Sequence, residues 1–175
     1  MLFRSSNINL SGIEFELAND ENKTEKLSNK INDLKEEYDF ILIDCPPSLG
    51  ILTVNSLVAS NSVIVPLQCE FFALEGLAQL LRTIEKVKEN LNPSLILEGV
   101  ILTMFDSRNR LSDDVVADAR EHLGSKVFET VIPRNVRLSE APSHGLPAII
   151  YDQNCIGSLA YINLAKELID RLGIQ

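Results

Sequence analysis

The stretch Tyr38–Gly50, YDFILIDCPPSLG, decides the fold. Within it, Phe40–Ile43 is a short apolar run between a charged segment and a Pro-Pro pair, which predicts a strand buried on both faces of a parallel sheet. The run ends on Asp44, and the prolines that follow cannot continue a strand. Because open α/β sheets bind ligands beyond the carboxyl ends of their strands, Asp44 is a candidate for holding Mg²⁺ through water in a nucleotide enzyme. The alternative is a carboxylate that only caps the next helix or accepts loop N–H groups.

The rest of the chain repeats this strand pattern and separates the strands by helices. Apolar runs predict further strands at Ser62–Val65, Gly99–Met104 and Lys126–Val131, and a short one at Ala148–Ile150. Helical spacing predicts helices over Asn19–Glu37, Ile51–Ser60, Leu74–Leu91, Ser112 (as N-cap) to His122, and Ile156–Leu172. This alternation predicts an α/β fold, a doubly wound, mostly parallel sheet flanked by helices, in a single domain spanning residues 1–175.

The strand ends make a further prediction, because carboxyl ends of parallel strands meet at one edge of a sheet. We therefore expect Asp44, Gln68, Phe105 and Pro133 to lie near one edge.

The composition limits the classes of function. The net charge of −9 argues against a broad nucleic-acid footprint, although five of the eight arginines fall between Arg108 and Arg137 and leave room for a local one. The three cysteines are odd in number and widely spaced, which favours a reducing cytoplasm over a disulfide framework or a zinc site. No apolar run approaches the roughly 20 residues that a membrane span needs.

Three segments resemble the ParA/Soj branch of the ParA/MinD partition ATPases. YDFILIDCPPSLG is similar to the second acidic motif of that family. Pro66–Leu77, PLQCEFFALEGL, is similar to its next strand exit and helix start, and Thr130–Gly145, TVIPRNVRLSEAPSHG, is similar to its base-binding loop. The segments occur in the expected order and the resemblance extends from about Leu10 to Leu172, so it implies a fold like that of the P-loop NTPases.

The resemblance also implies cofactors and site residues. It implies ATP and Mg²⁺, with Asp44 as the catalytic-site acid that holds the metal through water, and Pro133 and Asn135 as contacts to the adenine base. Arg108 and Arg137 match arginines that bind DNA without sequence preference, which suits a guanidinium because its planar fork fits a phosphate. The alternatives are a strand-to-helix turn, which Pro and Asn also favour, and ordinary solvated loop arginines.

The partners follow from the same resemblance. It implies a ParB-like protein, nonspecific DNA and an ATP-dependent homodimer, in a cytoplasmic, nucleoid-associated protein without a membrane partner. A membrane-associated MinD-like relative would carry a basic amphipathic carboxyl-terminal helix, whereas the end of this chain, AKELIDRLGIQ, mixes two acids with two bases.

One part of the family pattern is missing from the sequence. The family begins with a strand, a glycine-rich phosphate loop that bears two lysines, and a second strand, but no Gly-x-x-x-x-Gly-Lys-[Ser/Thr] stretch occurs here. The chain therefore resembles the carboxyl-terminal two thirds of such an ATPase, and we expect a truncated form that does not hydrolyse ATP alone. The alternative is a non-catalytic fragment that binds DNA or a partner, or a decayed remnant without activity.

Overall fold

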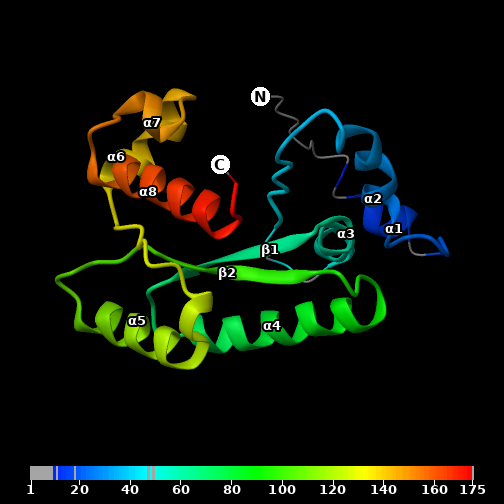
Figure 1. The fold of residues 1–175 in the computed structure, drawn as a ribbon, viewed down its shortest axis with the longest axis horizontal. Helices are drawn as coiled ribbons and strands as arrows, with labels where there is room; N and C mark the ends of the chain where they lie inside the picture. The colour runs from blue at the N-terminus through cyan, green and yellow to red at the C-terminus, as the bar shows by residue number, and fades with distance from the viewer. Residues whose placement is uncertain (1–9, 11, 18, 47, 49, 175) are drawn as a thin grey trace. The chain divides into compact units, whose positions relative to one another are not determined.

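The computed structural model describes residues 10, 12–17, 19–46, 48 and 50–174 (Figure 1). These residues divide into two compact units, of which the first holds residues up to 63 together with 80–96, and the second holds 64–79 together with residues from 97 onward. Strands β1 (Ser62–Gln68) and β2 (Ile96–Thr103) and helix α4 (Ala73–Asn90) contribute residues to both units. The expectation of a single domain stays a prediction.

The strands β1 and β2 pair directly and in parallel. At one end of the pair, the Ile96 N–H donates to the Asn61 carbonyl at 3.2 Å, and at the other end the Cys69 N–H donates to the Thr103 carbonyl at 3.0 Å. Both contacts follow the same register, so the two strands run in the same direction. The predictions of strands at Ser62–Val65 and Gly99–Met104 are confirmed. The predicted and observed ends differ by at most three residues.

A third extended segment lies on the other side of β2. It is joined to β2 by two parallel bridges, Val100 to Val127 and Phe105 to Pro133. The predicted strand at Lys126–Val131 is wrong as a regular strand, because Lys126 ends a short 3₁₀ helix and the residues from Val127 to Pro133 carry isolated bridges rather than a ladder. The whole arrangement is a parallel sheet with helices around it, which confirms the predicted α/β class.

Helices cover both faces of this sheet in the second unit. Figure 1 shows α5 (Arg110–Leu123) on one face and α8 (Ile156–Arg171) on the other. Beneath α8, the buried residues Ile101, Phe128 and Ile132 form a core, and Leu164 and Leu168 of the helix pack against it. The shorter elements of this unit are η3 (Gly124–Lys126), α6 (Val136–Glu140), η4 (Ala141–His144) and α7 (Ala148–Tyr151).

The first unit is held by two asparagines. Its helices are α1 (Ile13–Glu16), α2 (Lys26–Ile31) with η2 (Asn32–Leu34), and α3 (Ile51–Ala59). Asn55 of α3 donates to the Lys23 carbonyl at 2.8 Å and accepts from the Leu27 N–H at 3.2 Å, which ties α2 to α3. The buried Asn92 amide donates to carbonyls at the end of α3, those of Leu57, Val58 and Ser60. These bonds satisfy carbonyls that have no partner within the helix.

The predicted strand at Phe40–Ile43 is wrong. Residues 40–46 are described without a strand or a bridge, and the side chains of Phe40 and Leu42 are 47% and 85% exposed. A strand has no hydrogen bonds of its own and forms only beside a partner. No described segment pairs with this run, so its apolar pattern alone does not make it a strand.

Three smaller expectations are also corrected. Pro66 does not end β1, which continues to Gln68, because within the described part of the chain β1 pairs on one side only and a proline without an N–H is tolerated at an edge. The apolar run Ala148–Ile150 is helix α7 rather than a strand; short apolar runs do not distinguish the two. Asn109 rather than Ser112 caps α5, by accepting from the Leu111 N–H at 3.1 Å.

The long helices are otherwise as expected. The structure has α3, α4 and α8 within one residue of the predicted ends, whereas the Asn19–Glu37 helix is reduced to α2 and η2. Among the helices that the structure describes, none is long and apolar enough to cross a bilayer.

Gly99 allows β2 and the third segment to approach closely. A Cβ at Gly99 would lie 2.6 Å from the Lys126 carbonyl oxygen and 2.7 Å from the Phe128 ring. We expect Gly99→Ala to lower the free energy of unfolding by about 1–3 kcal/mol, as overpacking does. The control is Gly76→Ala in α4, where a Cβ meets nothing within 4 Å and a gain of up to about 1 kcal/mol is expected. Urea unfolding of both variants measures the free energy of unfolding. Equal stability of the two variants would contradict the prediction.

Candidate functional site

The carboxyl ends of β1, β2 and the third segment meet at one edge of the sheet. The Phe105 N–H donates to the Ile132 carbonyl at 3.1 Å, and the Arg134 N–H donates back to the Phe105 carbonyl at 2.8 Å. Since Cys69 pairs with Thr103 at the end of β1, the structure brings Gln68, Phe105 and Pro133 together as expected. We call this region the carboxyl edge.

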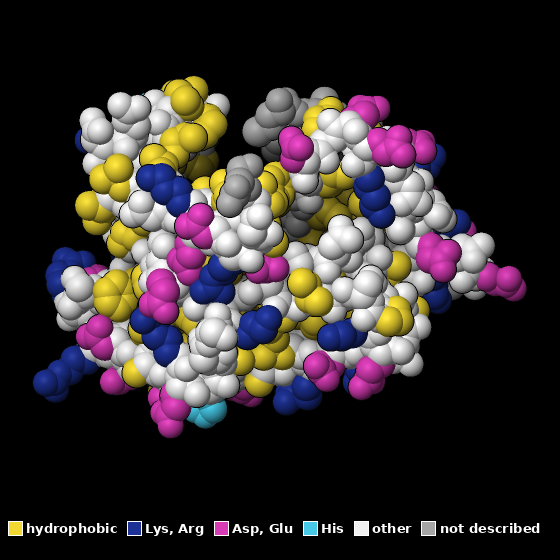
Figure 2. Space-filling model, viewed as in Figure 1, with side chains coloured by type: hydrophobic (Ala, Val, Ile, Leu, Met, Phe, Trp, Pro, Cys, Tyr) yellow, Lys and Arg dark blue, Asp and Glu magenta, His cyan; other side chains and the backbone are white. Residues whose placement is uncertain are grey.

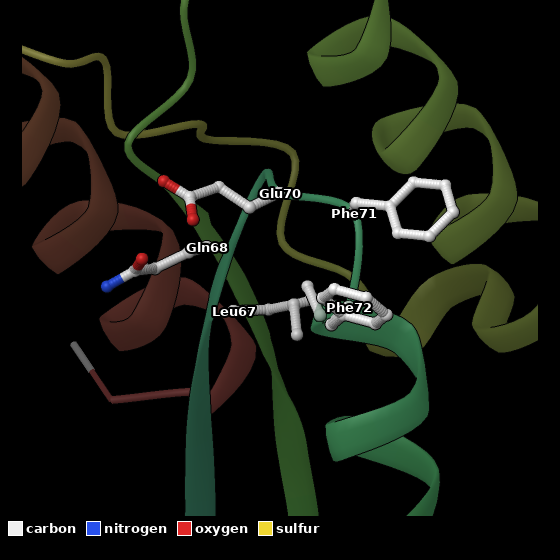
Figure 3. A pocket seen from close by; sticks show the side chains of 6 residues that line it. Leu67, Gln68, Glu70, Phe71 and Phe72 are labelled. Carbon is white, nitrogen blue, oxygen red and sulfur yellow. The ribbon is translucent and has the colours of Figure 1, made fainter.

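A shallow pocket of about 290 Å³ opens at the end of β1. It is lined by Leu67, Gln68, Glu70, Phe71, Phe72 and Ala73. Figure 3 shows the Gln68 and Glu70 side chains extending to one side of the strand end and Phe71 to the other. The rings of Phe71 and Phe72 meet edge to face at 5.0 Å, and both are more than 70% exposed. The edge therefore offers an apolar surface beside two polar side chains.

Pro133 and Asn135 sit where the third segment turns into α6. Pro133 is half-buried and bridges to Phe105, and Asn135 is the N-cap of α6, accepting from the Arg137 N–H at 2.9 Å. The side-chain oxygen of Asn135 is therefore used within the chain. Its amide nitrogen meets no acceptor among the described residues and can donate to a further group.

Arg108 is held by the aspartate two residues before it. Its Nε donates to Asp106 Oδ1 at 2.9 Å and its Nη2 to Oδ2 at 2.7 Å, while the Arg108 backbone N–H also donates to Oδ1. The hydrogen bond raises the pKa of Arg108, and the same side-chain and backbone bonds hold the pKa of Asp106 well below its ordinary value. The Arg108 side chain is nonetheless 85% exposed.

Arg137 is held in the same way by two acids. Its Nη1 donates to Glu140 Oε2 at 2.9 Å, one turn along α6, and its Nε lies 3.5 Å from Asp152 Oδ2. The hydrogen bond to Glu140 raises the pKa of Arg137, with a smaller contribution from Tyr151. The Tyr151 hydroxyl in turn donates to Glu140 Oε2 at 3.2 Å.

Asp44 belongs to the first unit. It is exposed, follows the unpaired run at residues 40–43, and forms no hydrogen bond or ion pair with another described residue. An unpaired, hydrated carboxylate suits a magnesium ion that keeps most of its water. Pro46 is also exposed and Gly50 is the N-cap of α3, whereas Pro47 lies outside the described residues. The catalytic role of Asp44 stays a prediction.

Arg134 was missed by the sequence analysis. Its Nη2 lies 3.5 Å from Glu70 Oε1, and its charge contributes to the lowered pKa of Asp106. Glu70 and Arg134 are 64 residues apart, so no local spacing could have found this pair. The Asp106–Arg108 pair, by contrast, is visible in the sequence as two opposite charges at close spacing.

Comparisons with known proteins agree on one family. The family model described as an AAA domain matches residues 2–97. The chromosome partitioning protein ParA of Caulobacter vibrioides is 54% identical over 164 residues, which cover 93% of this chain and 61% of that protein. The sporulation initiation inhibitor protein Soj of Bacillus subtilis is 51% identical over 161 residues, covering 92% of this chain and 64% of that protein. The chain thus spans somewhat less than two thirds of the length of these relatives.

A solved structure shares the fold of this chain. The cobyrinic acid a,c-diamide synthase of Mycobacterium smegmatis, crystallised with ADP and magnesium, superposes with a TM-score of 0.80 at 36% identity. The match covers 96% of this chain and 61% of that protein. The fold of this chain is therefore that of a nucleotide-binding α/β protein.

The cap at Asn135 generates a prediction about α6. Asn135→Ala removes the oxygen that accepts from the Arg137 N–H, and we expect the free energy of unfolding to fall by about 1 kcal/mol. Asn135→Asp keeps a capping oxygen and is the matched control, with stability close to that of the parent chain. Urea unfolding compares the three proteins. An Asn135→Ala variant as stable as the parent would show that the cap contributes nothing to folding.

Proposed function

This chain belongs to the ParA/Soj family of chromosome-partitioning ATPases, and from this premise we propose that it carries the base-binding and DNA-binding parts of a partition ATPase. The observation that carries the proposal is the carboxyl edge. There, one bridge between Phe105 and Pro133 joins the loop that bears Arg108 to the turn that bears Asn135 and Arg137.

The nucleotide part of the proposal concerns ATP and Mg²⁺. Pro133 supplies an apolar surface beside the base, and the free amide of Asn135 donates to a base acceptor. Asp44 holds magnesium through water, and the metal supplies charge stabilisation to a transferring phosphoryl group when it is bound. The solved structure with bound ADP and magnesium supports the choice of nucleotide and metal.

The DNA part concerns Arg108 and Arg137. Both are exposed guanidinium groups on adjoining segments of one unit, which suits contact with a phosphate backbone. On the face drawn in Figure 2, basic and acidic side chains are interspersed rather than gathered into one basic patch. A local and weak DNA contact therefore fits this chain better than a broad one.

The remaining proposals follow from the family. A ParB-like protein, nonspecific DNA and a second copy of the chain are the proposed partners, with nucleoid association in the cytoplasm. The second candidate is a non-catalytic fragment that binds DNA or a partner. It is favoured by the lack of a Gly-x-x-x-x-Gly-Lys-[Ser/Thr] stretch in the printed sequence.

We expect the purified chain not to hydrolyse ATP at a rate above background. Phosphoryl transfer depends on positioning and charge stabilisation, and a phosphate loop with its lysine supplies much of both. Base contacts alone leave nucleotide affinity near the millimolar range, about −4 kcal/mol. A phosphate-release assay and a nucleotide titration measure both quantities.

The assay is repeated after adding the part of the Caulobacter vibrioides relative that this chain does not cover. Activity and affinity should rise with that part and fall again in Asp44→Ala. If the chain alone turns over ATP and Asp44→Ala abolishes this activity, the proposal of inactivity is wrong. If the complemented mixture retains full activity in Asp44→Ala, the role of Asp44 is wrong.

We expect Arg108→Ala combined with Arg137→Ala to weaken DNA binding about equally for all sequences. Each phosphate contact contributes about −0.9 to the slope of log affinity against log salt, so the slope should become shallower by about two. The control, Arg82→Ala with Lys88→Ala on α4, removes the same net charge. Fluorescence anisotropy over a salt series measures this, and an unchanged slope in the double arginine variant would rule these arginines out as contacts.

A further inference from the structure

The two arginines proposed to bind DNA are both already engaged by carboxylates of this chain. Arg108 uses two N–H groups on the two oxygens of Asp106, at 2.9 and 2.7 Å. Arg137 donates to Glu140 at 2.9 Å and lies 3.5 Å from Asp152. The edge of each guanidinium that bears Nε is therefore already engaged by a carboxylate.

We propose that Asp106, Glu140 and Asp152 compete with DNA phosphates for Arg108 and Arg137, and that this competition sets the affinity for DNA. The inference rests on the proposed function, since it concerns the regulation of the same arginines. A carboxylate and a phosphate offer the same paired oxygens to a guanidinium fork. A phosphate that takes the Nε edge of either guanidinium therefore replaces the carboxylate instead of adding to it.

The acids are held in place by bonds that do not involve the guanidinium groups. Asp106 Oδ1 also accepts from the Arg108 backbone N–H at 3.1 Å, and Glu140 accepts from the Tyr151 hydroxyl. Asp152 Oδ1 accepts from the N–H groups of Asn154 and Cys155 at 3.2 and 3.1 Å. Each carboxylate thus stays beside its arginine after the arginine turns to DNA, so the competition persists in the complex.

The exposure of the arginine–carboxylate pairs limits how much they can change the affinity for DNA. The side chains of Arg108 and Arg137 are 85% and 53% accessible to solvent, so water and salt screen both pairs. Exposed pairs of this kind correspond to a change of about two- to fivefold in an equilibrium constant. The acids therefore lower DNA affinity without abolishing it.

The test replaces each acid by its isosteric amide in the full chain. Asp106→Asn and the pair Glu140→Gln with Asp152→Asn keep an acceptor oxygen for every backbone and tyrosine bond and remove only charge. The matched control is Asp114→Asn, an exposed acid of α5 that forms no ion pair with a described residue. The probe is a labelled duplex of about 30 base pairs without a specific site, titrated at several salt concentrations.

We expect each site's amide variants to bind about two to five times more tightly than the parent chain, and Asp114→Asn less than twofold. In a chain that already carries Arg108→Ala, the gain in DNA affinity from Asp106→Asn should fall to that of the control. The reason is that Asp106 then has no guanidinium to compete for. Binding by the amide variants when the parent chain binds too weakly to measure would also support the inference.

The outcomes separate this inference from the proposed function. If the parent chain binds DNA through the two arginines but the amide variants match the control, competition is wrong and DNA binding stands. If Asp106→Asn strengthens binding equally with and without Arg108, the effect is long-range charge and competition is again wrong. If neither the parent chain nor any amide variant binds DNA, both proposals are wrong.

Discussion

The geometry of the carboxyl edge depends on one ion pair, between Glu167 and Arg171 of α8. The Glu167 carboxylate accepts from the backbone N–H groups of Glu129 and Thr130 at 2.8 and 2.9 Å, while Arg171 donates to the carbonyls of Ser125 and Val127. The guanidinium of Arg171 also lies 4.0 Å from the Phe128 ring centre. Burial alone would raise the pKa of Glu167, but these hydrogen bonds outweigh it and leave the pKa below its ordinary value. Two side chains of a helix thus satisfy a segment that has only two bridges to the sheet.

These contacts explain how the segment from Val127 to Pro133 is held in position although it forms no regular ladder of hydrogen bonds with β2. Backbone groups without a partner are costly to bury, and α8 supplies partners on the side of the segment that faces away from β2. With residues 125–130 fixed, the bridge at Pro133 sets where the chain turns, and Asn135 then begins α6 at a defined point. The positions of Asn135 and Arg137 therefore follow from contacts made by residues that are 30 or more positions later in the sequence.

The sequence predicts the elements whose apolar pattern is long or whose partner is present. Helices α4 and α8 show many turns of helical spacing, and β1 and β2 are apolar runs that pair with each other. The pattern fails at Phe40–Ile43, where the strand needs a neighbour that the described residues do not supply, and at Ala148–Ile150, where three residues are too few to show a period. For the site, motif resemblance picks out Arg108, Pro133, Asn135 and Arg137. It does not pick out Arg134, because its partner Glu70 lies 64 residues away in the sequence.

The paired arginines bear on how an acidic chain could bind DNA as proposed. At long range the net charge of −9 repels DNA, and this repulsion is screened beyond a Debye length of about 8 Å at physiological salt. At contact, only the local guanidinium groups matter, and their acids are exchangeable because water competes for every exposed pair. Salt then acts in two opposite directions, since it weakens the arginine–phosphate contact and also the arginine–carboxylate contact that opposes it. Under the proposed function, such exchangeable pairs would make the DNA contact of this chain weak and readily reversed.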